Sequence, residues 1–129
     1  NGGYTNPRTA FDWISSDPNR VDEYIADPMC GYVPTAGLLG EVLKGVDFIT
    51  RPRNIEKMPK DLPVYIISGG DDPVGELGQG VLRCYKAFLK AGMQDVSLKL
   101  YPKLRHEILL EPARDEVMND VLNWINDEC

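Results

Sequence analysis

The hydrophobic pattern is clearest in the second half of the chain. Residues 63–68 (PVYIIS) form an unbroken apolar run that ends at two glycines, which predicts a strand buried on both faces of a parallel sheet. Apolar positions at helical spacing predict a helix over 79–91, with Gly92 just past its last turn. Alternation over 96–101 predicts a second strand, and Pro112 is expected to open a last helix. The order strand, helix, strand, helix indicates that the two strands are parallel.

The first half of the chain predicts short helices joined by loops. Asp17 followed by Pro18 is typical of a helix cap and the first helical position, and this helix should stop before Pro28. Thr35 is the expected cap of a second helix, whose apolar residues recur at helical spacing. The proline-containing stretch 51–60 is expected to be a linker.

Composition is typical of a soluble globular protein, since 43% of the 129 residues are hydrophobic and 26% are charged. No apolar run reaches the roughly 18 residues of a membrane-spanning helix. The net charge of −6 repels phosphate backbones, so nucleic acid is not an expected partner. Three widely spaced cysteines (Cys30, Cys84 and Cys129) show no metal-ligand spacing, and we expect free thiols in a reducing cytoplasm.

The candidate catalytic residues lie in two loops at the carboxyl ends of the predicted strands. Residues 69–74 (GGDDPV) follow the first strand, and residues 104–109 (LRHEIL) follow the second. Neighbouring strands lie about 5 Å apart, so a carboxylate of one loop can reach an imidazole of the other. His106 is the single histidine of the chain, so acid–base chemistry near neutral pH falls to it first.

Structural roles remain open for the same residues. Asp72 can cap a turn or the next helix, and a lone histidine in a loop is usually structural or solvated. Asp71 and Asp72 are poorly suited to act as an acid–base pair, because adjacent residues after a strand usually point apart. One histidine with scattered carboxylates gives no metal-ligand spacing, so no metal is expected. The glycine-rich residues 75–80 lack the P-loop lysine and are expected to form the turn into the helix.

Longer motifs carry a resemblance to a known family. Residues 62–75 (LPVYIISGGDDPVG), residues 101–109 (YPKLRHEIL) and the closing helix with Trp124 and Ile125 resemble the C-terminal part of an α/β-hydrolase. The resemblance is to the lysophospholipase and monoacylglycerol-lipase-like branch, also described as serine aminopeptidase-like hydrolases.

The resemblance extends to the first half of the chain and implies how the whole chain is organised. Residues 11–15 (FDWIS) and 22–27 resemble the segment between the lid and the core of that family. The implied fold is α/β, a partial α/β-hydrolase that ends in the βαβα unit of a parallel sheet. The chain then divides into a helical lid-to-core segment over 1–60 and a core part over 61–129, together one incomplete domain.

The resemblance also implies two members of a Ser–His–Asp triad. The family's acid lies in a G-x-x-D segment after the penultimate core strand, which falls on Gly69 and Asp72, and its histidine follows the last strand, which is His106. The family's nucleophile is a serine in G-x-S-x-G that precedes both, and none of the four serines here stands in that motif. The resemblance thus implies a C-terminal fragment of a cytoplasmic serine hydrolase for small lipid or other carboxylic esters, without metal or organic cofactor and inactive alone.

Other interpretations stay open at this point. A peptidase, a haloacid-type hydrolase or a thioester hydrolase can use the same aspartate and histidine. A non-enzymatic interaction domain, in which the two residues only hold loops in place, belongs to a different class. The chain opens at Asn1 rather than at a methionine, which we interpret as an artificial or proteolytic boundary in preference to a processed start.

Two structural expectations follow from the triad and from the truncated sheet. An Asp72 carboxylate oxygen should lie about 2.6–3.2 Å from His106 Nδ1. Two parallel strands with their helices leave an unpaired edge and an uncovered apolar face. We therefore expect a homodimer, or association with the missing N-terminal half.

Overall fold

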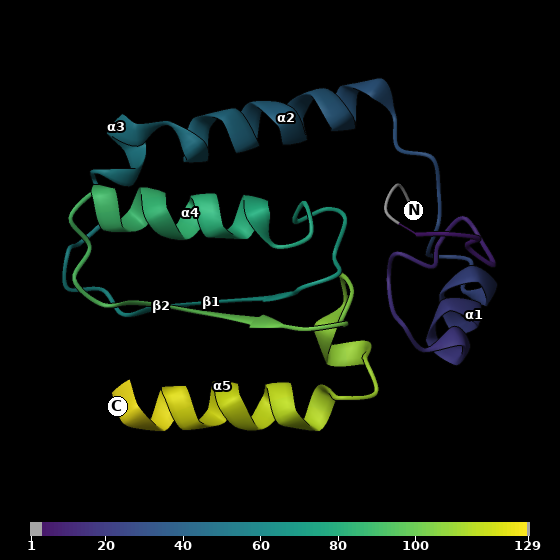
Figure 1. Ribbon diagram of the computed structural model, residues 1–129. Helices are drawn as coiled ribbons and strands as arrows, with labels where there is room; N and C mark the ends of the chain where they lie inside the picture. Colours follow the sequence, from purple (N-terminus) through teal and green to yellow (C-terminus); the bar gives the residue numbers. More distant parts are fainter. Residues whose placement is uncertain (1–3, 129) are drawn as a thin grey trace.

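A two-stranded parallel sheet between helices organises the chain (Figure 1). The computed structural model describes residues 4–128; the prediction for the Cys129 thiol lies outside the described residues. Strands β1 (Val64–Gly69) and β2 (Val96–Tyr101) pair along their whole length. The predicted positions of both strands and their parallel pairing are confirmed.

Two helices cover opposite faces of the sheet (Figure 1). Helix α4 (Gln79–Lys90) ends before Gly92, which has a φ of +86°, the left-handed conformation that glycine adopts freely after a helix. Helix α5 (Arg114–Glu128) begins two residues later than Pro112 suggested. A short 3₁₀ helix, η1 (Ile108–Leu110), precedes it and was not predicted, because a single turn carries no periodic pattern.

The sheet is only half-buried in this chain. The expectation that β1 is buried on both faces is wrong, since residues 64–68 are of intermediate burial and only Gly69 is fully buried. A two-stranded sheet leaves one open edge on each strand, and solvent reaches the side chains along it.

The packed core lies at the carboxyl end of the sheet. Tyr101, Leu104 and Val117 are buried against one another, and β2 is tied to α5 because Tyr101 Oη donates to Asp120 Oδ2 at 2.7 Å. Lys99 Nζ bonds the same carboxylate at 2.5 Å. The loops that follow both strands therefore leave the sheet beside this packed core.

Both helix caps predicted in the first half are confirmed. Helix α1 (Pro18–Ala26) is capped by the Asp17 side chain, which accepts from Asn19 N at 2.9 Å. Helix α2 (Ala36–Thr50) is capped by Thr35, whose hydroxyl accepts from Leu38 N at 3.2 Å.

The predicted linker over 51–60 is wrong in part. It contains the one-turn helix α3 (Pro52–Ile55), in which proline occupies the first helical position and Ile55 is buried. Proline is tolerated there because the first amide of a helix has no partner to lose. Within residues 4–128, no helix is long and apolar enough to cross a membrane.

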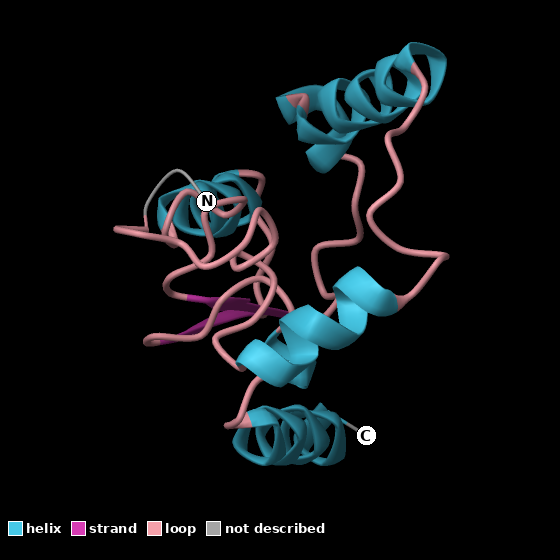
Figure 2. Ribbon diagram, turned by 90° about the vertical axis from the view of Figure 1, so that its right-hand side faces the viewer, coloured by secondary structure: helices cyan, strands magenta, loops and turns pink. Residues whose placement is uncertain are grey.

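Helix α2 is apolar but uncovered. None of its residues is buried. Figure 2 shows α2 displaced to one side of the stack formed by α4, the sheet and α5. Its large hydrophobic side chains are all exposed, by 47% to 68%: Leu38, Leu39, Val42, Leu43, Val46, Phe48 and Ile49.

Candidate active site

The loops that follow β1 and β2 leave the sheet side by side. Gly70 N donates to Tyr101 O at 2.8 Å, and Asp71 N donates to Leu104 O at 2.9 Å. These bonds continue the backbone pairing past the ends of the strands. They bring the two loops of candidate residues together at one edge, as the strand order predicted.

Gly69 permits this close approach. A Cβ atom on Gly69 would overlap the carbonyl oxygens of Leu104 and Arg105. Backbone atoms cannot yield as a flexible side chain can, so the first residue of the G-x-x-D segment must lack a side chain. The glycine of the motif is therefore required by the loop that carries His106.

Asp72 is 5% exposed and uses both carboxylate oxygens. Its Oδ1 accepts from Val74 N at 2.8 Å, and its Oδ2 lies 3.0 Å from His106 Nδ1. The second distance falls within the predicted range. The turn-capping role and the histidine contact, which the sequence left as alternatives, are both present. The catalytic role of the two residues stays a prediction.

The His106 side chain is 35% exposed, which leaves the ring accessible from the surface. An Nδ1–H that donates to Asp72 leaves Nε2 as the basic nitrogen. The ring also packs against Trp13, with ring centroids 5.0 Å apart at 54°. The arrangement can accept a proton at Nε2 and stabilise the resulting imidazolium at Nδ1.

Asp71 lies outside the pair. Its side chain is exposed, whereas that of the adjacent Asp72 is buried, in agreement with the prediction that the two would not form an acid–base pair. The Asp71 carbonyl accepts from Tyr4 Oη at 2.5 Å, and the Tyr4 ring stacks on the Arg105 guanidinium at 4.3 Å. Burial raises the pKa of Tyr4 above its ordinary value, so this hydroxyl stays protonated and keeps its donor.

The glycine-rich residues 75–80 form the predicted turn into α4. Three consecutive residues, Glu76, Leu77 and Gly78, have φ of +52°, +53° and +84°. The turn is held by the Leu77 amide, which donates to Asp72 O at 2.8 Å. The chain thus reverses sharply directly after the aspartate.

The sequence did not predict that the backbone at Trp13 and Ile14 is hydrogen-bonded to the loop that carries His106. His106 N donates to Trp13 O at 3.3 Å, and Glu107 N donates to Ile14 O at 2.8 Å. Residues 11–15 were singled out only as part of the family resemblance. Contacts between segments ninety positions apart leave no spacing in the sequence from which to predict them.

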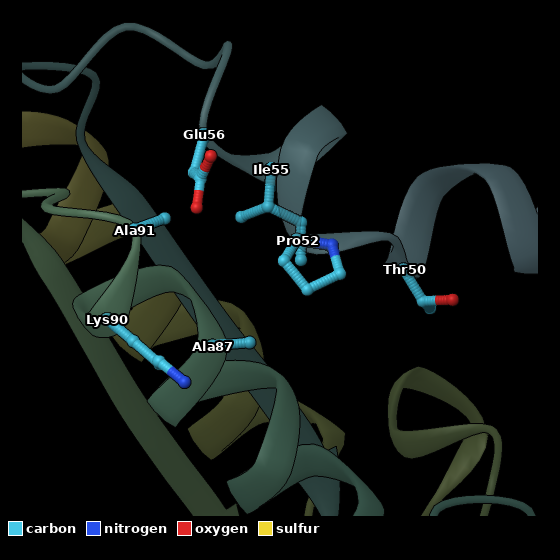
Figure 3. A pocket seen from close by; sticks show the side chains of 7 residues that line it. All are labelled: Thr50, Pro52, Ile55, Glu56, Ala87, Lys90 and Ala91. Atoms are coloured by element: carbon cyan, nitrogen blue, oxygen red, sulfur yellow. The ribbon is translucent and has the colours of Figure 1, made fainter.

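Two pockets of the structure are lined by residues other than Asp72 and His106. A pocket of about 120 Å³ lies between α3 and the end of α4, and Figure 3 shows the side chains that line it. An apolar groove of about 640 Å³ runs between α2, α3 and α4. Neither is lined by Asp72 or His106.

Cys30 and Cys84 are free, and within residues 4–128 no group of three or more His, Cys, Asp or Glu side chains could hold a metal ion.

Comparisons with known proteins agree on one family. The family model described as serine aminopeptidase, S33, matches residues 3–113. A monoacylglycerol lipase of Mycolicibacterium smegmatis is 29% identical over 119 residues, which are 88% of this chain and 38% of that protein.

Solved structures of an esterase and a lipase share the fold of this chain. A thermostable carboxyl esterase from Bacillus coagulans superposes with a TM-score of 0.87 at 35% identity, over 95% of this chain and 40% of the esterase. A lipase in an open form superposes with a TM-score of 0.87 at 22% identity, over 97% of this chain and 41% of the lipase. The chain thus spans about 40% of the length of these relatives.

Proposed function

This chain belongs to the serine aminopeptidase (S33) family of α/β-hydrolases, and on that premise we propose that it supplies the acid and the histidine of a Ser–His–Asp triad that hydrolyses carboxylic esters. The observation that carries the proposal is the 3.0 Å contact between Asp72 Oδ2 and His106 Nδ1 at the carboxyl ends of two parallel strands. Asp72 is the proposed triad acid, and His106 is the proposed general base.

The mechanism follows the roles that this geometry allows. His106 Nε2 takes the proton of the serine hydroxyl as its oxygen attacks the ester carbonyl, and returns it to the departing alcohol. Water then hydrolyses the acyl-enzyme with the same base. Asp72 holds the Nδ1–H tautomer and stabilises the imidazolium, while Val74 N fixes the other carboxylate oxygen.

The nucleophile is proposed to lie outside this chain. Its four serines stand outside the G-x-S-x-G motif that exposes a catalytic serine on a sharp turn. Asp72 and His106 alone cannot form an acyl-enzyme, so the chain by itself is proposed to be inactive. The mechanism uses neither a metal nor an organic cofactor.

The proposed substrates are small carboxylic esters, including monoacylglycerols and lysophospholipids. Support comes from the esterase at 35% identity and the monoacylglycerol lipase at 29% identity. Peptide hydrolysis is the second candidate, favoured by the description of the matching family as a serine aminopeptidase. We assign the protein to the cytoplasm on the basis of the free thiols of Cys30 and Cys84.

The proposal includes an assembly. We propose the division into a lid-to-core segment over 1–60 and a core part over 61–129. The apolar side chains of α2 are exposed, and each strand of the two-stranded sheet has one unpaired edge. Burying such surface stabilises by roughly 25 cal/mol per Å². We propose that the isolated chain covers it by forming a homodimer, and that in a longer protein the N-terminal half covers it.

A chimera tests the proposed chemistry. The matched 40% of the Bacillus coagulans esterase is replaced by this chain, and hydrolysis of p-nitrophenyl butyrate is measured for the chimera and for the chain alone. The chimera should be active and the chain inactive. Asp72→Asn should lower kcat by about 10⁴-fold and His106→Ala by about 10⁶-fold, the losses typical of a triad acid and a triad histidine.

Asp71→Asn is the matched control, because it removes the exposed neighbouring carboxylate. It should leave kcat within about twofold of the parent chimera, as an exposed charge outside the pair has little influence. A folded chimera, verified by circular dichroism, that is inactive or that keeps its rate with Asp72→Asn would disprove the assignment.

A further inference from the structure

A buried carboxylate outside the Asp72–His106 pair holds the histidine loop. Glu111 is 1% exposed, and its carboxylate accepts from the nearby histidine loop and from Ser16, 95 positions away. Arg105 N donates to Oε1 at 2.7 Å. Ser16 N donates to both oxygens, at 2.9 and 3.0 Å, and Ser16 Oγ donates to Oε2. A buried charge is costly unless such bonds replace its hydration, so the carboxylate needs all of these donors.

The hydrogen bonds of Glu111 are part of a continuous set that holds the backbone around His106. Three consecutive amides are held: Arg105 N by Glu111, His106 N by Trp13 O, and Glu107 N by Ile14 O. The Arg105 side chain reaches the same segment through the carbonyls of residues 12 and 15. The backbone that carries the imidazole is therefore fixed on both sides.

We propose that Glu111 is a positioning residue for His106. Its carboxylate holds the Arg105–Glu107 backbone against the segment over 13–16 by hydrogen bonds. The position of this backbone in turn sets the distance from His106 Nδ1 to Asp72 and the contact of the ring with Trp13. Glu111 acts through the backbone and touches neither substrate nor the reacting atoms. The inference deepens the proposed function and rests on it for the catalytic consequence.

The bonding pattern requires a carboxylate and not merely a polar group of that size. Both oxygens of Glu111 accept hydrogen bonds. In Glu111→Gln, one oxygen becomes an NH₂ group, which faces donors that it cannot satisfy. Glu111→Asp keeps two acceptors on a side chain one methylene shorter. The glutamine variant should therefore disturb His106 more than the aspartate variant does.

NMR of the chain itself gives the first test. His106 is the single histidine, so its imidazole ¹H–¹⁵N signals are unambiguous. The parent should show an Nδ1–H protected from exchange by Asp72. In Glu111→Gln, at a temperature where the chain is folded, this proton should exchange at least about tenfold faster and the Nδ1–H tautomer should lose population.

Met93→Ala is the structural control for this measurement. Met93 is buried beyond the end of α4, away from the loops that carry the pair. It should lower the melting temperature while leaving the imidazole signals unchanged. Unchanged signals in folded Glu111→Gln would overturn the proposal. If that variant does not fold, Ser16→Ala takes its place, because it removes one donor and keeps the carboxylate; an effect on Nδ1–H supports the proposal and none overturns it.

The chimera gives the second test and separates the two proposals. Glu111→Gln should lower kcat about tenfold with KM within twofold, because small displacements of a catalytic group cost rate, and Glu111→Asp should recover most of the loss. An unchanged kcat would contradict the positioning role. If the chimera does not depend on Asp72 while the imidazole signals still respond to Glu111→Gln, the proposed function fails and the positioning role stands.

Discussion

Two regions of this molecule differ in whether their side chains find partners within the chain. At the carboxyl end of the sheet, the buried polar groups around His106 find partners within the chain: Asp72 uses both oxygens, and Glu111 bonds two segments. Along α2, by contrast, seven large apolar side chains remain exposed. The buried carboxylates beside His106 are thus hydrogen-bonded within the chain, whereas the apolar side chains of α2 lack cover.

The difference has a physical origin. Hydrogen bonds are directional and local, so a histidine loop can be completed by a few donors and acceptors from nearby segments. Apolar cover needs extended area, and the large apolar side chains of α2, which lies beyond α4 from the sheet (Figure 1), are left exposed. Substitutions in the two regions should therefore have consequences of different kinds, on stability in one and on association in the other.

The largest effect is expected at Gly69. In Gly69→Ala, the added Cβ overlaps two backbone carbonyls of the histidine loop, so the loop must move away from β1. We expect a loss of about 3–5 kcal/mol in the free energy of unfolding, measured in urea, and loss of the protected His106 Nδ1–H.

Gly40→Ala is the matched control in the other region. A Cβ at Gly40 meets nothing within 4 Å, and the residue lies inside α2. Alanine should stabilise the chain by up to about 1 kcal/mol through its higher helix propensity. A Gly69→Ala variant as stable as Gly40→Ala would show that the two loops do not approach as closely as described.

A smaller effect, on association instead of folding, is expected along α2. Leu43 is 68% exposed, and its replacement by lysine removes apolar surface from the proposed interface. If the isolated chain is a homodimer, Leu43→Lys should raise its dissociation constant by about tenfold or more, since one buried leucine contributes about 1.5–3 kcal/mol. Light scattering across a dilution series measures the change.

Lys44→Ala serves as the control, because it alters the adjacent position without removing apolar area. It should leave the dimer unaffected. A parent chain that scatters as a compact, stable monomer at low micromolar concentration would contradict the homodimer itself.

The smallest effect is expected between β2 and α5. The hydrogen bonds from Lys99 and Tyr101 lower the pKa of Asp120 below its ordinary value. A group with a depressed folded pKa contributes stability above its unfolded pKa, near 4, and loses it as the pH falls through the folded value. Asp120→Asn should therefore be less stable than the parent at pH 7, and the gap should close as the pH falls below about 4.

Urea midpoints of both proteins at pH 7, 4 and 3 measure this gap. The effect should be modest, since partly exposed ion pairs contribute little. A gap that stays constant across this range would show that the Asp120 carboxylate gains nothing from its charge.

The parts of the fold that sequence predicts well are those with local causes. Both strands, the caps at Asp17 and Thr35, and the glycine after α4 follow from periodicity and from single-residue conformational preferences. The strand order also predicted that the two loops of candidate residues meet at one edge. The choice of Asp72 as the partner of His106 came from the family resemblance.

The parts that sequence did not predict depend on context. The one-turn elements α3 and η1 are too short to repeat a pattern. The apolar periodicity of α2 predicted a helix with an apolar face but not what covers that face. Glu111 left only a weak signal, a lone charge between apolar residues and a proline, and its partner Ser16 lies 95 positions away.

That separation also fixes when the site is completed during folding. Closing a loop of 95 residues costs more entropy than forming a helical turn or closing the shorter loop between the strands, so we expect contacts of this span to form after the helices and the strand pair. During synthesis, residues 13–16 leave the ribosome before Glu111, which follows Ser16 by 95 positions. The hydrogen bonds that hold the histidine loop through Glu111 can therefore form only after Glu111 has been made.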